Sequence, residues 1–330
     1  MSEKVVLTGI KPTGMPHLGN YIGALKPLIE QSHTQKTFMF IADLHALNTI
    51  HDAKQIKQHT YEIAGMLVAL GLNLDNAVLF RQSDIDEIYK LNTFLMNVTP
   101  KGLMNRAHSY KASVDRNVAN GLDVDAGVNM GLFTYPILMS ADILLYNADI
   151  VPVGADQKQH VEFARDIAGY FNNIYGDTFK MPEPVIGEET GLIPGLDGRK
   201  MSKSYDNTIA LFAPEKELKK KIMRIITDSK TPEEAKNPDE STIFQLYKHF
   251  ATDAEIAEFA QMFRAGGMGY GTAKIILFDK VNSVLAGPRA EYERLMANID
   301  EIEKILADGA SKARVVAQET LGRVKRAMLG

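Results

Sequence analysis

Short apolar runs alternate with helix-like stretches along the first part of the chain. Three such runs predict buried strands, at residues 5–10, 37–47 and 76–83. Helical periodicity extends over residues 53–72 and 84–98, and a further helix opens near Pro16. Strands and helices that alternate at this spacing are typical of a doubly wound parallel sheet, whose ligand crevice lies at the carboxyl ends of the strands. The sequence therefore predicts an α/β, Rossmann-like domain.

The composition narrows the class of protein. The 330 residues are 45% hydrophobic and 24% charged, as in an ordinary globular protein. The chain has no cysteine, which excludes disulfides, thiolate zinc sites and a cysteine nucleophile, and no His-Glu-x-x-His motif points to a protein-bound metal. No apolar run approaches the ~20 residues that cross a bilayer, and Met-Ser-Glu-Lys at the N-terminus lacks a signal-peptide pattern. We expect a cytoplasmic protein with no membrane segment.

The loop after the first predicted strand is a candidate anion-binding site. Residues 11–16 read as a turn rich in Gly and Pro, and the helix then opens at His17. Free N–H groups and the helix dipole at such a junction attract phosphates. His17 and Asn20 add side-chain donors, and Gly19 leaves room for a flat base against the backbone. Pro27 stands where the apolar pattern continues, so we expect a kink or break there.

A second candidate anion site is the loop Gly198–Asn207. Lys200 and Lys203 lie three residues apart, among Met201, Ser202 and Ser204. Most lysine-rich loops are only solvated. A mobile loop of this composition is nevertheless able to bring two ammonium groups onto one polyphosphate.

Further candidates lie between these two loops. Tyr135, Met139 and Asp142 recur at i, i+4 and i+7 and share one helical face. A carboxylate on an apolar face needs a partner, and the alternative for Asp142 is a buried structural salt bridge. His45 is either a structural histidine or a pocket wall. Residues 149–160 predict a strand, a glycine turn and a helix, which would form a second crevice.

The rest of the chain differs in character. Residues 100–131 are irregular and read as an insertion, and from Pro214 onward the pattern is mainly helical. With a net charge of −4, RNA contact must come from local basic patches. Two basic runs fit that role, although charge runs are usually solvated faces: Lys216, Lys219, Lys220, Lys221 and Arg224, then Lys312, Arg314, Arg323, Lys325 and Arg326.

Both loops resemble the signatures of class I aminoacyl-tRNA synthetases. Lys200 to Ser204 matches the second signature, Lys-Met-Ser-Lys-Ser, and His17-x-Gly19-Asn20 is similar to the first, His-Ile-Gly-His, in its His-x-Gly-Asn variant. Over essentially the whole chain the pattern resembles the tryptophanyl-tRNA synthetase family. The stretches that carry this resemblance begin at Gly9, His17, Tyr135, Val153 and Lys200.

The same sequence pattern resembles that of tyrosyl-tRNA synthetases, which typically carry glutamine in place of Met139. A methionine gives a soft apolar wall for an indole, and Asp142 remains to accept the indole N–H, so these residues favour tryptophan. Two further hypotheses remain open. One is a cofactor nucleotidyltransferase of the same superfamily, and the other is a synthetase-like protein that binds tryptophan or tRNA without charging activity.

The resemblance implies a role for each matching residue. Tryptophan would contact Leu7, Gly9, Tyr135, Met139, Asp142, Val151, Val153 and Gln157. ATP would contact Gly9, Lys11, Pro12, Thr13, His17, Gly19, Asn20, Gly154, Ala155, Asp156, Leu192, Lys200, Met201, Ser202, Lys203 and Ser204. The catalytic groups would be His17, Asn20, Lys200 and Lys203. Lys11 departs from the family, in which many members carry glutamine at this position.

The resemblance also implies the reaction and the organisation of the chain. ATP, carrying Mg²⁺, would activate L-tryptophan, and tRNA(Trp) would receive it; the family is typically a homodimer. Residues 1–190 would form the Rossmann-like catalytic domain, with residues 100–131 as an insertion or dimer region. Residues 191–210 would be the mobile lysine loop, and residues 211–330 an all-α anticodon-binding domain.

Overall fold

The computed structural model describes residues 4–154, 158–186 and 192–330. Its strands form one parallel sheet in the order β3-β2-β1-β4-β5, which confirms the predicted doubly wound architecture. The strands are β1 Val6–Ile10, β2 Thr37–Ile41, β3 Ala77–Arg81, β4 Ile150–Val153 and β5 Glu183–Ile186. The sequence pattern had indicated every strand except β5.

Helices connect and cover these strands. Before the lysine loop they are α1 Leu18–Asn20, α2 Lys26–Ser32, α3 Asp43–Ala46, α4 Ala53–Ala69, α5 Asp86–Met96, α6 Lys101–Met104, α7 His108–Ala119, α8 Met130–Leu145 and α9 Lys158–Tyr175. After it they are α10 Glu215–Met223, α11 Thr242–Tyr247, α12 Asp253–Ala265, α13 Tyr270–Met296 and α14 Ile299–Leu329. Among the described residues, no helix combines the length and apolarity needed to cross a bilayer.

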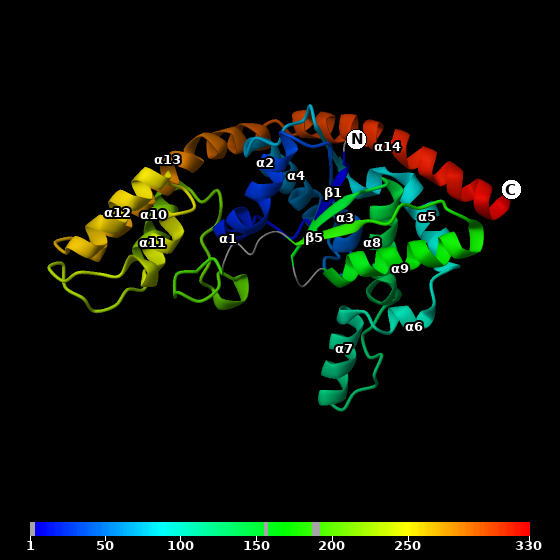
Figure 1. Ribbon diagram of the computed structural model, residues 1–330, viewed down its shortest axis with the longest axis horizontal. Helices are drawn as coiled ribbons and strands as arrows, with labels where there is room; N and C mark the ends of the chain where they lie inside the picture. Colours follow the sequence, from blue (N-terminus) through cyan, green and yellow to red (C-terminus); the bar gives the residue numbers. More distant parts are fainter. Residues whose placement is uncertain (1–3, 155–157, 187–191) are drawn as a thin grey trace.

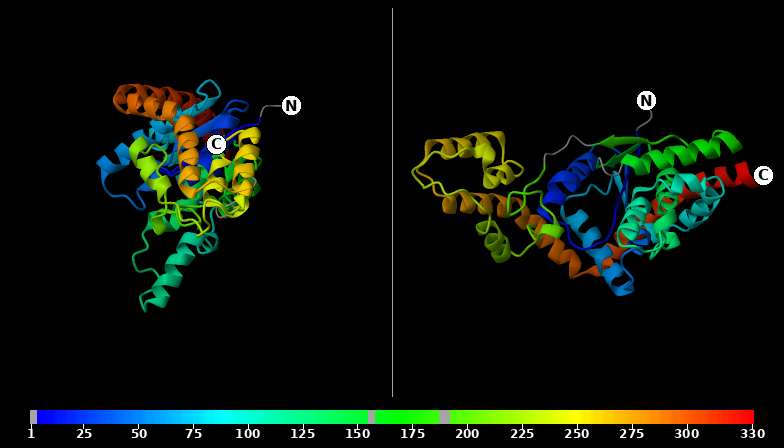
Figure 2. Two further views of the ribbon diagram at one scale, coloured as in Figure 1. Left: turned by 90° about the vertical axis from the view of Figure 1, so that its left-hand side faces the viewer. Right: turned by 90° about the horizontal axis from the view of Figure 1, so that it is seen from below.

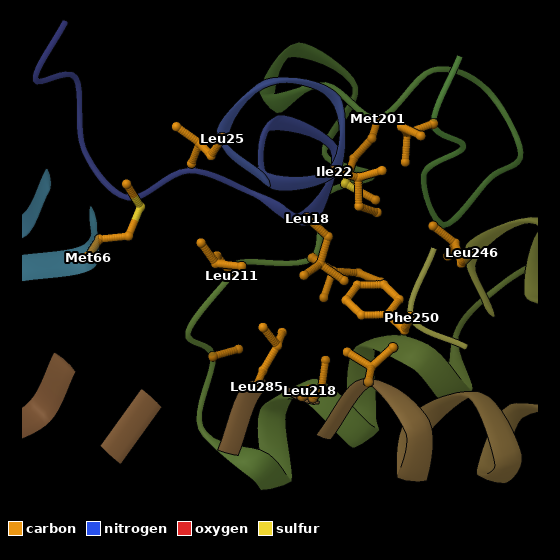
Figure 3. Close-up of a cluster of buried hydrophobic side chains, with 14 of the residues drawn as sticks. Leu18, Ile22, Leu25, Met66, Met201, Leu211, Leu218, Leu246, Phe250 and Leu285 are labelled. Atoms are coloured by element: carbon orange, nitrogen blue, oxygen red, sulfur yellow. The ribbon is translucent and has the colours of Figure 1, made fainter. Parts of the chain in front are cut away.

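The sheet is buried on both faces, as an all-parallel sheet must be. Along β2, Met39 and Ile41 point into one apolar cluster, and Phe38 and Phe40 point into another. The first cluster continues through the helices after residue 211, where Leu18, Leu211, Leu218 and Leu285 come together (Figure 3). The sheet domain and the helical region therefore share one apolar core.

Two long helices join the ends of an elongated molecule. α11 and α12 lie at one end and the C-terminal end of α14 lies at the other, with the sheet between them, and α13 and α14 follow one another along the length of the molecule (Figures 1 and 2). α7 projects away from the sheet (Figure 1). α14 returns over the sheet domain, where Ala313, Ala317 and Leu321 join the same cluster as Phe38. This last helix therefore completes the covering of the sheet.

We expect Gly309→Ala to destabilise the fold, because α14 crosses β3 there in close contact. A Cβ on Gly309 would overlap the carbonyl oxygen of Leu79 and lie 2.6 Å from its carbonyl carbon. Overpacking against rigid backbone costs about 1–3 kcal/mol, whereas Gly→Ala in an open helix stabilises by roughly 0.5–1 kcal/mol. Chemical unfolding followed by circular dichroism measures the change. Gly322→Ala, on the same helix, is the control because its nearest neighbour is the Arg326 tip at 3.6 Å. Stabilisation by both substitutions would contradict the close contact.

The helix changes form beside Pro27, where a kink or break was expected, and one other local expectation was wrong. There is no break at Pro27: residues 21–25 form a π-helical turn in which the Lys26 N–H donates to the Tyr21 oxygen, and α2 then begins. The wider turn directly precedes the proline, which has no N–H to donate. The second strand ends at Ile41, and Asp43 and His45 lie on the short helix α3 rather than at the end of a strand.

Candidate active site

The loop between β1 and α1 lies at the carboxyl end of the sheet, beside the strand pair β1–β4 at which the strand order reverses. This is where ligands bind in open α/β sheets. Gly9, the last residue but one of β1, contacts Phe40, and a Cβ at Gly9 would overlap the tip of that ring and lie 2.8 Å from its Cε2. In the following loop Pro12 is buried, Thr13 is exposed and Lys11 is half-buried, and burial lowers the pKa of the Lys11 ammonium.

His17 caps the helix and has its tautomer set by the cap. Its Nδ1 accepts a hydrogen bond from the Asn20 N–H at 3.2 Å, and the Asn20 Oδ1 accepts from the His17 N–H at 3.3 Å. Since Nδ1 is an acceptor, the proton of the neutral ring is on Nε2. Burial, and then the charge of Lys203, lower the pKa of His17. The site therefore presents a neutral N–H donor.

The lysine loop is joined to this first signature. Leu18 N–H donates to the Ile209 oxygen at 2.9 Å, and Leu211 N–H donates to the Pro16 oxygen at 3.1 Å. Met201 is buried beside Leu18 and Ile22 (Figure 3), with its sulfur 3.2 Å from the Gly19 nitrogen. Two segments that are far apart in the sequence thus form one structural unit.

The contact gives Gly19 a structural role that the sequence did not indicate, beside the predicted contact with a base. A Cβ there would lie 3.0 Å from the His17 ring and 3.2 Å from Cβ of Met201. Gly19 therefore makes room for the two signatures to meet. Lys200, Lys203 and Ser204 are exposed beside this contact, with Ser202 half-buried.

Asp142 is buried at the centre of a second polar group. Its Oδ2 lies 2.9 Å from Nε2 of His45, and Nε2 of Gln82 donates to Oδ1 at 2.8 Å and to Oδ2 at 2.9 Å. Only 2% of the residue is exposed, and this burial raises the pKa of its carboxyl. The partner required by a carboxylate on an apolar face is thus a pair of side chains, from α3 and from the turn after β3.

Tyr135 lies near this group. Its hydroxyl accepts from Ser109 Oγ at 3.2 Å and lies 3.1 Å from Nε2 of His160, and its ring meets the edge of the His45 ring at 6.4 Å between centroids. The apolar residues expected around tryptophan lie in or against one cluster: Leu7 and Val151 are buried, and Met139 and Val153 are partly buried.

Some of the expected site residues are not joined to either polar group. Gly154 is exposed at the end of β4, and Leu192 is 75% exposed. Ala155, Asp156 and Gln157 lie outside the described residues.

Three neighbours of the site were not among the residues expected to contact a substrate: Gln82, Ser109 and His160. A fourth neighbour, His45, had two open interpretations, a structural histidine or a pocket wall, and the structure places it against Asp142. The signals in the sequence were the strand ends for Gln82 and the stretch of family resemblance that includes His160, and Ser109 had none.

Comparisons with known proteins identify the family of the chain. The model of the family described as tRNA synthetases class I (W and Y) matches residues 2–286. A Neisseria meningitidis protein named tryptophan–tRNA ligase is 50% identical over 331 residues, which cover 99% of this chain and 98% of that protein.

Solved structures extend the similarity. Tryptophanyl-tRNA synthetase from Campylobacter jejuni, complexed with ADP and tryptophan, is 42% identical with a TM-score of 0.90 over 98% of both chains. Tryptophanyl-tRNA synthetase from Mycoplasma pneumoniae is 29% identical with a TM-score of 0.79 over 99% of this chain and 98% of that one. With both signatures in contact and a family match over most of its length, the chain belongs to the class I tRNA synthetases of the W and Y family.

Proposed function

We propose that this chain activates L-tryptophan with ATP to tryptophanyl-adenylate, releases pyrophosphate, and transfers the tryptophan to the 3′ end of tRNA(Trp). The observation that carries the proposal is the contact between the His17 cap and the lysine loop, together with the buried Asp142 that His45 and Gln82 hold in place. Relatives named as tryptophan–tRNA ligases over nearly the whole chain, and a similar structure with ADP and tryptophan, support it. We infer a cytoplasmic location, because charged tRNA serves protein synthesis there.

The chemistry requires positioning and charge stabilisation. The tryptophan carboxylate is already ionised, so it attacks the α-phosphate of ATP in line without a general base, and pyrophosphate leaves with Mg²⁺. Nε2–H of His17 donates to phosphate oxygens, and the ammonium groups of Lys200 and Lys203 neutralise the charge that develops on pyrophosphate. A neutral His17 beside Lys203 avoids repulsion between two cations at the same phosphates.

The remaining ATP contacts surround these catalytic groups. We propose that the loop after β1 holds the phosphates, that Gly19 and Asn20 lie under the nucleotide, and that Gly154, Ala155 and Asp156 hold the ribose. Leu192 and Met201 then flank the adenine. The residues of this proposed set are Gly9, Lys11, Pro12, Thr13, Gly19, Asn20, Gly154, Ala155, Asp156, Leu192, Met201, Ser202 and Ser204.

Tryptophan is selected by one polar contact in an apolar pocket. We propose that Asp142 accepts the indole N–H, and that Tyr135 and Gln157 hold the α-amino group. Leu7, Met139, Val151 and Val153 form the walls. The acceptor is a carboxylate that His45 and Gln82 hold in place, so it does not have to reorient when the indole binds.

The remainder of the chain serves tRNA and assembly in this proposal. The helical region after residue 211 binds the anticodon arm, with residues 191–210 as the signature loop and residues 1–190 as the catalytic domain. The projecting segment 100–131 joins two copies in a homodimer. Its exposed apolar side chains support an interface: Val118 is 59% exposed, Leu122 56% and Val124 45%.

Amino-acid-dependent ATP–pyrophosphate exchange tests the proposal. We expect exchange with tryptophan, and background exchange with tyrosine or without an amino acid. The chain contains no tryptophan, so bound tryptophan is also detected by its own fluorescence. Exchange with tyrosine instead would overturn the substrate. Tryptophan binding without exchange would favour a binding protein that lacks charging activity.

A further inference from the structure

We infer that Asn207 is a positioning residue that fixes the backbone of the lysine loop, and thereby holds Lys200 and Lys203 at the phosphates. Asn207 lies where the loop closes and is only 2% exposed, while both lysines are exposed. The inference rests on the function proposed above for these two lysines.

The Asn207 amide uses its acceptor and both its donors. Its Oδ1 accepts from the Ser202 N–H at 2.8 Å. Its Nδ2 donates to the Lys200 carbonyl oxygen at 3.0 Å and to Asp197 Oδ1 at 2.7 Å. Among side chains of this length, only asparagine supplies one acceptor and two donors from a single planar group. One residue therefore connects both sides of the loop.

The approach to the loop is shaped around the same residue. Leu196 N–H donates to the Asn207 carbonyl oxygen at 2.9 Å. A Cβ on Gly195 would lie 2.6 Å from that oxygen and overlap the Asn207 amide, so only glycine fits there. Asp197 also accepts from the N–H of Arg199 at 3.1 Å and from its Nε at 2.8 Å. Asn207 therefore joins the approach segment, residues 195–199, to the loop itself, residues 200–207.

This arrangement combines a backbone fixed by hydrogen bonds with exposed cationic side chains. The Lys200 carbonyl and the Ser202 N–H are both fixed by Asn207, and Met201 between them bonds through its N–H to the Ile193 oxygen at 2.9 Å. Lys203 follows directly. The lysine stems leave the backbone at set points, while their ammonium groups stay free to follow the phosphates. Positioning of this kind contributes to rate because charge must be in place before the transition state forms.

A double-mutant cycle with Lys203→Ala tests the inference. We expect Asn207→Ala to lower kcat for pyrophosphate exchange by about 10- to 100-fold, the loss that misplacement of about 1 Å causes. The dissociation constant for tryptophan, measured by fluorescence, stays unchanged. In the Lys203→Ala background the part of the loss that acts through Lys203 disappears, because a misplaced backbone no longer moves that ammonium group, whereas the part that acts through Lys200 remains.

Two further variants separate positioning from folding. Asn207→Asp keeps the size and the acceptor but loses both donors and faces Asp197, so kcat falls even if Asn207→Ala fails to fold. Adding Asp197→Asn restores a donor between the two positions and recovers part of kcat, although the bond to the Lys200 oxygen stays lost. Asn237→Ala is the control, since the Asn237 side chain accepts one backbone N–H in an exposed turn. Its kcat stays at the wild-type value.

The outcomes distinguish the two proposals. If Lys203→Ala leaves exchange intact, the proposed role of the loop fails. If Lys203→Ala slows exchange but the losses of the two substitutions simply add in the double variant, the positioning role of Asn207 is overturned. The same holds if Asn207→Ala weakens tryptophan binding by as large a factor as it lowers kcat. Loss of kcat alone, together with non-additivity and partial recovery in the paired variant, supports it.

Discussion

The substitution Asp142→Ala is expected to lower kcat/KM for tryptophan by about 10- to 100-fold, since a hydrogen bond to a charged group contributes about 1.5–3 kcal/mol. Discrimination against phenylalanine is expected to suffer more. A site built to bond a substrate N–H rejects an analogue without it by about 10⁴–10⁵, because the buried acceptor is left unpaired. Gln82 and His45 occupy three of the roughly four lone-pair positions of this carboxylate. One position on Oδ1 remains for the proposed bond from the indole N–H, and Asp142→Ala removes it.

Pyrophosphate exchange with tryptophan and with phenylalanine measures both effects. Asp142→Asn is the matched control: it keeps the shape and one acceptor, so we expect intermediate selectivity. The wild type and Asp142→Asn are also expected to differ in how their tryptophan affinity depends on pH. Burial raises the pKa of Asp142, so its carboxylate protonates above the range of an ordinary aspartate as the pH falls. Tryptophan affinity of the wild type then declines on acidification, whereas that of Asp142→Asn stays level. Normal selectivity in Asp142→Ala would remove Asp142 from the indole site.

Local patterns predicted the parts of the site that a short segment determines. An apolar run, a turn rich in Gly and Pro and a helix start predicted the loop at His17, and helical periodicity predicted that Tyr135, Met139 and Asp142 share a face. The lysine loop is recognisable because the five residues of its signature, Lys200 to Ser204, are consecutive in the sequence. In each case the residues that matter lie within about two turns of one another, where backbone geometry alone fixes their relation.

The relations that the sequence did not reveal join distant segments. Asp142 meets His45 and Gln82 from across 97 and 60 residues, and Met201 meets Gly19 across 182. These contacts depend on strand order and on how helices pack over the sheet, which periodicity does not encode. β5 has few apolar residues to mark it, with the sequence Glu-Pro-Val-Ile. The packing of α14 on β3 is signalled only by Gly309, one of two glycines in a long helix, and the sequence does not distinguish it from Gly322.

The substitution Lys203→Ala is expected to slow tryptophanyl-adenylate formation by about 100- to 1000-fold, the loss that follows removal of one preorganised donor from a developing charge. Lys203 is close enough to His17 for its charge to lower the pKa of that ring, so its ammonium lies on the side of the site where the phosphates are proposed to bind. Tryptophan binding should not change, because the Asp142 pocket is built from other elements. Single-turnover adenylate formation and tryptophan fluorescence measure the two quantities separately.

Loss of rate with unchanged tryptophan affinity would show that Lys203 acts only after the amino acid is bound. Lys304→Ala is the matched control, because it removes an exposed lysine from α14 and should leave both quantities at wild-type values. The Lys203→Ala variant also tests the influence of Lys203 on the pKa of His17. Without Lys203, only burial lowers the His17 pKa, so the imidazole protonates at a higher pH than in the wild type while remaining below its ordinary value. A His17 titration that is identical in wild type and Lys203→Ala would place the ammonium away from the phosphates, and the lysine loop would then need another role.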